Sequence, residues 1–264
     1  MTCIKKTSKP TMKNSKDAKN LRTDTIYSSP QDTVQPFEFN QSVAAVFDDM
    51  ISRSVPGYAF NLDLISLAAS RYAQADSHLY DLGCSSGRAT LALAEASPET
   101  CRIIGVDSSA AMIDACSASL DDSPHGHRVE LRCEDLLETP LRNASMIVLN
   151  YTLQFLPITD RKPLIEKIHA ALKPRGLVFV AEKVADSVPH QQIALDALHL
   201  DFKRSTGYSE LEIAQKRAAL ERVLIPESEQ EHLDRLRSAG FETVATLSKA
   251  INFCGFIGIK AGQT

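Results

Sequence analysis

Residues 80–87 read Tyr80-Asp81-Leu82-Gly83-Cys84-Ser85-Ser86-Gly87 and join a short apolar run to a segment with helical spacing. Gly83 would let the backbone pass close to a ligand, and Gly87 would let the helix begin tightly against the strand. On a parallel sheet, ligands bind outside the carboxyl ends of the strands, which is where this turn would lie. The stretch is not GxGxxG, because it lacks the middle glycine that makes room for a pyrophosphate, and this counts against NAD or FAD.

Short apolar runs alternate with amphipathic segments on both sides of this turn. The predicted strands are His78–Leu82, Arg102–Val106, Arg128–Cys133, Ser145–Tyr151 and Leu177–Ala181. The predicted helices between them pass through Leu91, Leu93 and Ala94, then cover Ala111–Leu120 and Pro163–Leu172, and two more precede the sheet, around Val43–Ile51 and Leu62–Tyr72. Strands that alternate with helices of this length predict βαβ units and a parallel sheet covered on both faces.

The chain changes character after the fifth predicted strand. A long helical stretch runs from about Gln191 to Arg222, and another helix is expected over Ser228–Ser238. Two final strands, Thr243–Leu247 and Ile251–Ile259, lie too close together for a crossover helix. We therefore expect them to pair antiparallel or to lie on either side of a neighbour. The domain would span residues 36–264, with a helical insert at about 188–225.

Polar residues follow three further strands of the predicted sheet. Asp107 ends the second strand and could accept both hydroxyl hydrogens of a ribose. Asp135 follows the third strand, where a carboxylate could accept from an adenine amino group, and Asn150 ends the fourth, where it could face an amino-acid portion of the ligand. Any one of them could be an ordinary turn residue. Together with the glycine turn, at successive strand ends, they predict a nucleoside site.

Charge and length exclude several classes of protein. The chain has 264 residues and a net charge of -4, which argues against general nucleic-acid binding. Its apolar stretches are far shorter than the ~20 residues of a membrane span. Residues 1–25 hold seven Lys or Arg and two Asp, a net of +5, so the rest of the chain carries -9. This stretch has almost nothing apolar, so we expect a disordered basic tail over residues 1–35, solvated rather than bound to RNA.

The cysteines and histidines do not form a metal site. Six cysteines occur without a CxxC pair or a Cys/His group at zinc spacing, and His125-Gly126-His127 falls in a Pro/Gly turn without a third ligand. There is no export signal, so we expect reduced thiols and a cytoplasmic protein without a bound metal.

The glycine turn resembles that of the class I S-adenosylmethionine (SAM) methyltransferases. Asp81–Gly87 is similar to their glycine motif, and Leu172–Gly176 to the start of their fifth strand, with Arg175 where a second glycine is usual. The resemblance covers about residues 75–185. It implies a Rossmann-like α/β fold, a seven-stranded, mostly parallel sheet with helices on both faces, and SAM as the ligand.

Three stretches outside those motifs are more specific: Ser52–Tyr58, Asn150–Leu156 and Asp201–Arg217. With Asn143–Met146 they resemble the carboxy-SAM synthase family of bacterial tRNA wobble-uridine modification, from about Phe37 to the C-terminus. The resemblance implies that SAM is carboxylated on its sulfonium methyl, with prephenate supplying carbon dioxide and leaving as phenylpyruvate. A sulfonium stabilises negative charge on the adjacent carbon, which can then attack carbon dioxide.

The family pattern also implies which residues contact SAM or its carboxylated product. The matching positions are Tyr58, Gly83, Cys84, Ser85, Asp107, Asn150 and Arg217, to which Asp135 adds the third strand end. Ser108 stands where the family has Asn, Leu136 where it has Ile, Tyr151 where it has Phe, and Ser86 where it has Leu. Arg217 would clamp the new carboxylate, since a guanidinium grips a carboxylate bidentately and stays charged.

Prephenate has two carboxylates, so further basic residues are expected near the site. Arg53, Lys203 and Arg204 are candidates, although a solvated helix face explains them equally well. No protein residue is an obvious methyl base. His199 lies in the insert, but a lone histidine at helical spacing is more often core or surface, and an anion formed from prephenate could take the proton.

The same resemblance implies a homodimer and a functional link to a downstream tRNA carboxymethyl transferase, with no direct nucleic-acid contact and no membrane. Two other hypotheses remain open at this point. One is a small-molecule SAM-dependent methyltransferase, and the other is a non-catalytic SAM-binding partner of a tRNA-modifying enzyme. Arg217→Ala distinguishes them, because only the synthase needs a carboxylate clamp.

Overall fold

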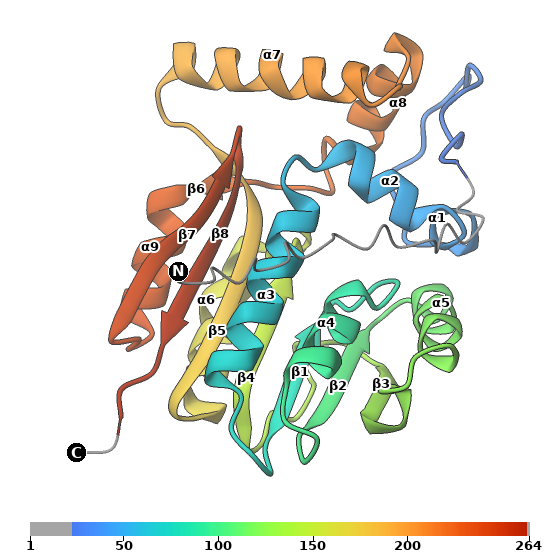
Figure 1. The fold of residues 1–264 in the computed structure, drawn as a ribbon. Helices are drawn as coiled ribbons and strands as arrows, with labels where there is room; N and C mark the ends of the chain where they lie inside the picture. Colours follow the sequence, from blue (N-terminus) through green and yellow to red (C-terminus); the bar gives the residue numbers. More distant parts are fainter. Residues whose placement is uncertain (1–22, 263–264) are drawn as a thin grey trace, which may run out of the picture.

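A mixed sheet organises residues 23–262, the part of the chain that the computed structural model describes (Figure 1). Its order is β3-β2-β1-β4-β5-β8-β7, and β6 pairs with β5 beyond that path. The strands are β1 (His78–Leu82), β2 (Arg102–Asp107), β3 (Val129–Cys133), β4 (Ala144–Asn150), β5 (Leu172–Ala185), β6 (Glu227–Ser228), β7 (Thr243–Ala250) and β8 (Phe253–Ile259).

The first five strands are parallel, and β8 runs antiparallel to both β5 and β7. The expected mostly parallel α/β fold is therefore confirmed, with eight strands rather than seven, and of the two arrangements open for the last two strands the antiparallel pair is the one observed. Strand order reverses at β1, which lies between β2 and β4. At such a reversal the connections leave a crevice at the carboxyl ends of the strands.

Helices cover both faces of the sheet and its carboxyl edge (Figure 1). They are α1 (Gln41–Ala44), α2 (Phe47–Ser54), α3 (Tyr58–Tyr72), α4 (Arg88–Ala96), α5 (Ala110–Asp121), α6 (Ile158–Ala171), α7 (Pro189–Ser205), α8 (Glu210–Leu220) and α9 (Glu229–Ser238), with short 3-10 turns η1 (Gly126–Arg128) and η2 (Leu153–Phe155). Ile65 and Leu93 of α3 and α4 are buried on one face, and Ile168 and Leu236 of α6 and α9 on the other. Helices α2, α7 and α8 lie beyond the carboxyl ends of the strands.

The insert differs from the single long helix expected over about Gln191 to Arg222. Helix α7 ends at Ser205, and Gly207 adopts φ 96 before α8 begins. Ser209 and Glu212 form a capping box at the start of α8. A capping box begins a new helix, because its two side chains satisfy backbone N–H groups that have no partner within the helix. The break folds α8 back beside α7, so two helices rather than one cover the edge of the sheet.

Strand β5 is longer than the predicted Leu177–Ala181. It begins at Leu172 and continues to Ala185, where β6 and β8 supply hydrogen-bonding partners that local sequence does not reveal. Arg175, which stands where the methyltransferases usually have a glycine, adopts φ 62. This left-handed conformation explains why a glycine is common there.

The expected tail over residues 1–35 is wrong for residues 23–35; residues 1–22 lie outside the described residues. Asp24 and Tyr27 are buried, and the Gln31 N–H donates to Gln215 Oε1 at 2.7 Å. The segment has few apolar residues, but side chains of α2 and α8 satisfy its polar groups, so its low apolar content does not leave it solvated. Among the described residues, no helix has the length and apolar character needed to cross a membrane.

Candidate functional site

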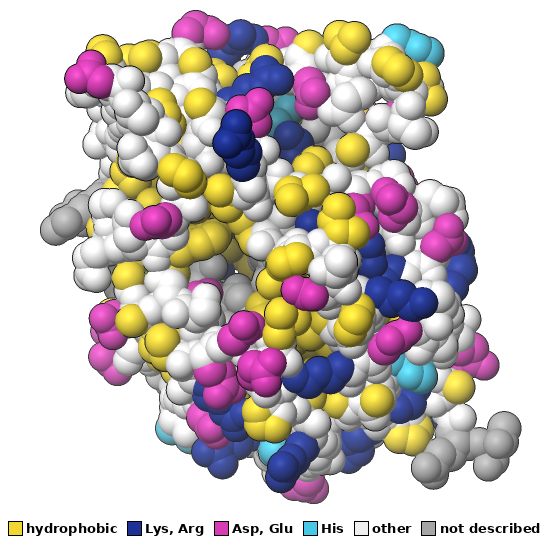
Figure 2. Space-filling view, turned by 180° about the vertical axis from the view of Figure 1, so that it is seen from behind, with side chains coloured by type: hydrophobic (Ala, Val, Ile, Leu, Met, Phe, Trp, Pro, Cys, Tyr) yellow, Lys and Arg dark blue, Asp and Glu magenta, His cyan; other side chains and the backbone are white. Residues whose placement is uncertain are grey.

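A cavity of about 730 Å³ lies at the carboxyl ends of β1, β2, β4 and β5, below the helices of the insert. Seen from behind, hydrophobic side chains gather in the hollowed middle of the molecule, between the helices above and the rest of the sheet (Figure 2). Most of the residues predicted to bind the nucleoside and the product line this cavity: Gly83, Ser85, Asp107, Ser108, Asp135, Leu136, Asn150 and Arg217. The cavity thus brings together side chains from the glycine turn, three strand ends and the insert.

The glycine turn is fixed to the end of β2. The backbone N–H groups of Ser85 and Ser109 donate to the two oxygens of Asp107, at 3.0 and 2.9 Å. Burial raises the pKa of Asp107, while these two N–H groups oppose the shift. Gly83 adopts φ 84, and a Cβ there would lie 2.6 Å from Thr152 Oγ1. The turn therefore needs glycine at this position for both its conformation and its space.

Ser86 replaces the family's leucine in this turn, and its hydroxyl has a specific role. Ser86 Oγ donates to Asp48 Oδ1 at 2.5 Å, which ties the turn to α2. This hydrogen bond joins two elements that border the cavity.

Asn150 presents an acceptor without a partner. Its Oδ1 is buried and forms no hydrogen bond to any described residue. Buried polar atoms are nearly always paired, so an orphaned acceptor in a cavity wall indicates a ligand that donates to it. The ammonium of an amino-acid ligand has the required chemistry, as expected for the amino-acid end of SAM.

Tyr58 and Cys84 lie beside the cavity rather than in its lining. Tyr58 is buried against Tyr151, with ring centroids 6.2 Å apart, and burial raises the pKa of its hydroxyl. A hydrogen bond with Cys116 and burial raise the pKa of the Cys84 thiol. That thiol is directed toward β2, where it would contact a Cβ at Gly105. Their direct contact with SAM stays a prediction.

The opposite end of the cavity is cationic. Lys183 of β5, Lys203 of α7 and Lys216 and Arg217 of α8 all line it. Burial, followed by the charges of Lys216, Lys183 and Arg217, lowers the pKa of Lys203 to about 7. Burial also lowers the pKa of Lys216 to about 8, although Asp24 lies 3.5 Å away and Ser54 Oγ accepts from its ammonium at 2.9 Å.

Of the basic candidates for prephenate, Lys203 alone lines the cavity. Arg53 stacks over Tyr208 at 4.0 Å and pairs with Asp49. Arg204 is on the exposed side of α7, where it pairs with Asp201 and Glu210. The sequence made all three residues equal candidates, because it does not show which side of a helix faces the cavity.

His199 also lines the cavity, one helical turn before Lys203. Its Nε2 lies 2.9 Å from the Ser54 carbonyl oxygen. Burial and the nearby Lys203 lower the pKa of His199 to about 3, so the ring is neutral near pH 7. A ring with this pKa is a weak proton acceptor.

Aromatic residues that the sequence did not single out form the apolar wall. Phe37, Phe39 and Phe155 line the cavity, and Phe39 packs edge-on against both of the others at 5.1 Å. The spacing of Phe37 and Phe39 puts both rings on one side of an extended segment, which was a readable signal. This signal falls where the sequence predicts the boundary of a tail.

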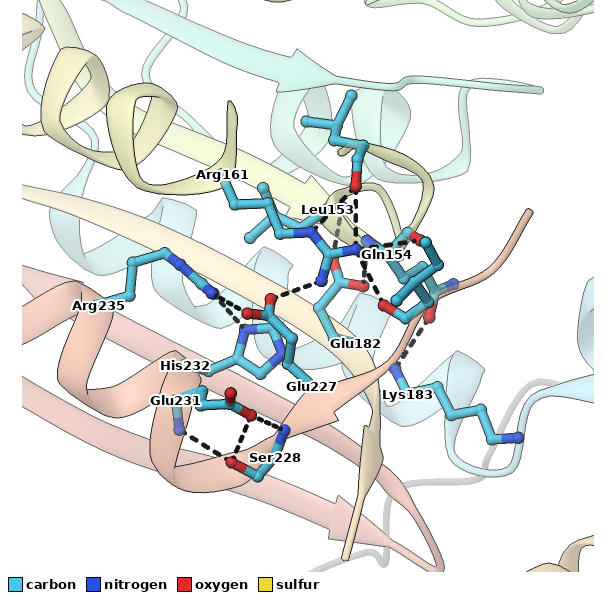
Figure 3. Close-up of polar contacts among 12 residues, drawn as sticks. Leu153, Gln154, Arg161, Glu182, Lys183, Glu227, Ser228, Glu231, His232 and Arg235 are labelled. Atoms are coloured by element: carbon cyan, nitrogen blue, oxygen red, sulfur yellow. Dashed lines mark hydrogen bonds and ion pairs between the residues drawn. The ribbon is translucent and has the colours of Figure 1, made fainter. Parts of the chain in front are cut away.

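The loop after β4 that borders the cavity is held from beneath by the buried side chains of Glu182 and Arg161 (Figure 3). The Glu182 carboxylate accepts from the N–H groups of Thr152, Leu153 and Gln154 at 3.1, 2.7 and 3.1 Å. Burial raises the pKa of Glu182 to about 8, although these donors and Arg161 favour its charged form. Arg161 donates to the Leu156 carbonyl at 3.0 Å and pairs with Glu227, so both sides of the loop are fixed.

No group of three or more His, Cys, Asp or Glu side chains suited to a metal ion occurs between residues 23 and 262. His125 precedes the short 3-10 turn η1, and His127 lies within it.

Sequence relatives agree with this geometry. The sequence profile of a methyltransferase domain family matches residues 79–176. A carboxy-S-adenosyl-L-methionine synthase from Hahella chejuensis is 46% identical over 243 residues, which cover 90% of this chain and 98% of the relative. One from Trichlorobacter lovleyi is 47% identical, covering 90% of this chain and 99% of the relative.

The chain belongs to the carboxy-S-adenosyl-L-methionine synthase family. Solved methyltransferases share its fold at much lower identity. A putative O-methyltransferase from Nostoc punctiforme has a TM-score of 0.60 and 18% identity, covering 83% of this chain and 59% of that one. The apo form of the SAM-dependent methyltransferase SibL has a TM-score of 0.59 and 16% identity, covering 82% and 58%. These neighbours support the Rossmann-like methyltransferase fold of the synthase family.

Proposed function

We propose that this member of the carboxy-SAM synthase family converts SAM and prephenate to carboxy-SAM and phenylpyruvate. The observation that carries the proposal is a single cavity with hydrogen-bond acceptors at one end and cations at the other, in a chain about 46% identical to a named carboxy-SAM synthase. An acceptor-rich end suits the hydroxyl and amino groups of SAM, and a cationic end suits carboxylates.

The atoms of the reaction balance without an added cofactor. Prephenate loses its ring carboxylate as carbon dioxide and its ring hydroxyl as hydroxide, which leaves phenylpyruvate. The sulfonium methyl gives up one proton, its carbon bonds to the carbon dioxide, and the proton and hydroxide form water.

The residues around the acceptor-rich end fit SAM. Gly83 and Ser85 leave the backbone of the turn open to the ligand, and Asp107 and Asp135 offer carboxylates for ribose hydroxyls and the adenine amino group. Asn150 would accept from the amino-acid ammonium with its orphaned Oδ1. Their part is to bind and orient SAM so that its methyl faces the insert.

Arg217 would hold the new carboxylate. Its side chain is exposed to the cavity and has no hydrogen-bond or ion-pair partner among the described residues. A free guanidinium can bind a carboxylate bidentately, and it keeps its charge at any pH of interest. His199 is neutral and holds the Ser54 carbonyl, so we assign the methyl proton to an anion derived from the donor rather than to a protein base.

The use of the product, the location of the protein and its oligomeric state are part of the proposal. We propose that carboxy-SAM supplies the carboxymethyl group for tRNA wobble uridine modification by a downstream transferase, that the protein acts in the cytoplasm, and that it forms a homodimer. Exposed Ile193 and Leu198 on α7 support the dimer, because they are apolar and uncovered in one chain. Sedimentation should give twice the mass of one chain; a monomer at micromolar concentration would contradict the dimer.

Mass spectrometry tests the reaction directly. Protein incubated with SAM and prephenate should yield a nucleoside heavier than SAM by one carbon dioxide, and omission of prephenate should abolish it. Arg217→Ala should lose this product while retaining the fold. Unchanged SAM in the complete mixture would contradict the proposal and favour the alternative, a small-molecule methyltransferase with an unknown acceptor.

A further inference from the structure

Lys203 is a largely buried residue whose ammonium has no partner among the described residues. The residue is 8% exposed and lines the cavity, and its ammonium forms no hydrogen bond or ion pair with any residue from 23 to 262. A buried charge that is neither paired nor hydrogen-bonded costs several kcal/mol in the free protein. Such a residue in a cavity wall indicates an anionic ligand that is absent from the isolated chain.

The charges around Lys203 increase this cost. Lys183 from β5 and Arg217 from α8 face the same cavity, and neither side chain forms a hydrogen bond or ion pair with a described residue, although the charge of Asp196 favours the protonated form of Lys183. Lys216 is different, because Asp24 lies 3.5 Å from its ammonium and compensates its charge. The lining also holds Asp196, which accepts weakly from Asn252 at 3.4 Å, and the exposed Glu221. Even with these acids, the end formed by Lys183, Lys203 and Arg217 is positively charged.

SAM cannot neutralise this end of the cavity. At neutral pH its carboxylate and ammonium cancel and its sulfonium remains, so bound SAM adds positive charge. The second ligand must therefore bring the negative charge. Leu200 and Phe253 line the same cavity and provide apolar contact for a ring. The chemistry that fits is a dicarboxylate on an apolar ring.

We propose that Lys203, supported by Lys183, binds a carboxylate of the dicarboxylate donor, at a subsite separate from the Arg217 clamp for the new carboxylate. This inference rests on the proposed function, which names the donor. It makes Lys203 a specificity-determining residue for the donor that contributes little to SAM affinity. The i,i+4 spacing of His199 and Lys203 on α7 points both into the cavity, so a neutral ring and an ammonium lie side by side in the subsite.

Binding without turnover tests the subsite. S-adenosylhomocysteine lacks the reacting methyl, so prephenate can be titrated by calorimetry into protein loaded with it. For Lys203→Met we expect the prephenate Kd to rise about 10- to 100-fold, the range for one charge-assisted hydrogen bond, while the Kd of SAM changes less than about 2-fold. Lys203→Arg should recover part of the affinity. Arg204→Met is the matched control, because it removes a cation from the next residue of α7, outside the cavity.

Each outcome decides between the two proposals. If Lys203→Met weakens SAM as much as prephenate, the lysine holds the carboxylate of SAM and the subsite is overturned; unchanged prephenate binding overturns it as well. If the parent protein binds prephenate through Lys203 but forms no carboxy-SAM, the proposed reaction fails and the subsite stands. If the parent protein neither binds prephenate nor reacts with it, both are wrong.

Discussion

At the scale of single residues, the unpaired charge of Lys203 should be visible in the stability of the free protein. Its pKa falls from an ordinary 10.5 to about 7, because burial and the charges of Lys216, Lys183 and Arg217 oppose protonation. His199 and Asp196 on the same helix also face this cavity. Below pH 7 both folded and unfolded states hold the proton, and the full cost of the buried charge is present. Between about pH 7 and 10.5 the unfolded state binds more protons, so the free energy of unfolding rises with pH.

Lys203→Met should therefore stabilise the unliganded protein by about 1–4 kcal/mol below pH 7, a gain that shrinks toward pH 10. Urea unfolding at several pH values measures this. A purely structural lysine would behave in the opposite way, since its loss would destabilise the protein at every pH. Arg204→Met should show neither effect, because Arg204 is exposed and paired.

The orphaned acceptor of Asn150 gives a second prediction for a single residue. Asn150→Ala removes the Oδ1 that we assign to the SAM ammonium, and a hydrogen bond to a charged group contributes about 1.5–3 kcal/mol. The SAM Kd should rise about 10- to 100-fold by calorimetry. Asn252→Ser is the control, because Asn252 Oδ1 is also buried and unpaired but lies outside the cavity. If both variants lose SAM affinity equally, the loss reflects damage to the fold and not a missing contact with SAM.

The residues of the cavity show how much of the site the sequence could predict. Asp107, Asp135 and Asn150 line one cavity, as expected when parallel strands end at one edge, a rule that needs only strand assignments; their contact with SAM stays a prediction. Lys203 remained one of three equal candidates. Lys203 and Arg204 are consecutive residues of one helix, and the sequence does not show which of them faces the cavity and which faces solvent. Lys183 was missed, since the predicted fifth strand stopped before it.

At the scale of elements, the Glu182 carboxylate of β5 positions η2 and the loop that carries Tyr151 and Phe155 to the cavity. Glu182→Gln replaces an acceptor oxygen with an NH₂ group that faces backbone N–H donors. The substitution should cost about 1–3 kcal/mol, lower the Tm by a few degrees and weaken SAM binding several-fold. Glu231→Gln is the control. Glu231 is a capping residue of α9 away from the cavity, so its loss should leave SAM affinity unchanged.

Elements were predictable where a local pattern fixes them. The parallel strands and their helices follow from alternation, but the length of β5 depends on β6 and β8, which come from distant sequence. The break between α7 and α8 had a local signal, Gly207 followed by Ser209 and Glu212, that apolar periodicity outweighed. Residues 23–35 had no such local signal, because their order depends on bonds to α2 and α8.

At the scale of the whole molecule, residues 23–40 connect the insert to the sheet. Asp24 accepts from Tyr208 at 2.6 Å and compensates Lys216, and the Phe37 N–H donates to the Ala219 carbonyl at 3.0 Å. At the far end, Ser109 Oγ donates to the Phe39 carbonyl at 2.5 Å, next to the carboxylate of Asp107. This one segment thus contacts α8, the apolar wall and the end of β2. We therefore expect residues 23–40 to be required to close the cavity.

Two truncations test this role. A protein that starts at residue 23 keeps the contacts described above for the segment, so we expect its Tm and SAM affinity to match the full chain. A protein that starts at residue 41 loses Asp24 and leaves the buried Lys216 without its carboxylate, a change that costs about 3–5 kcal/mol. It also removes Phe37 and Phe39 from the cavity wall. Its Tm should fall by about 10 °C and SAM binding should be lost, measured by thermal unfolding and calorimetry. SAM binding that survives the longer deletion would show that the insert and the sheet close the cavity by themselves.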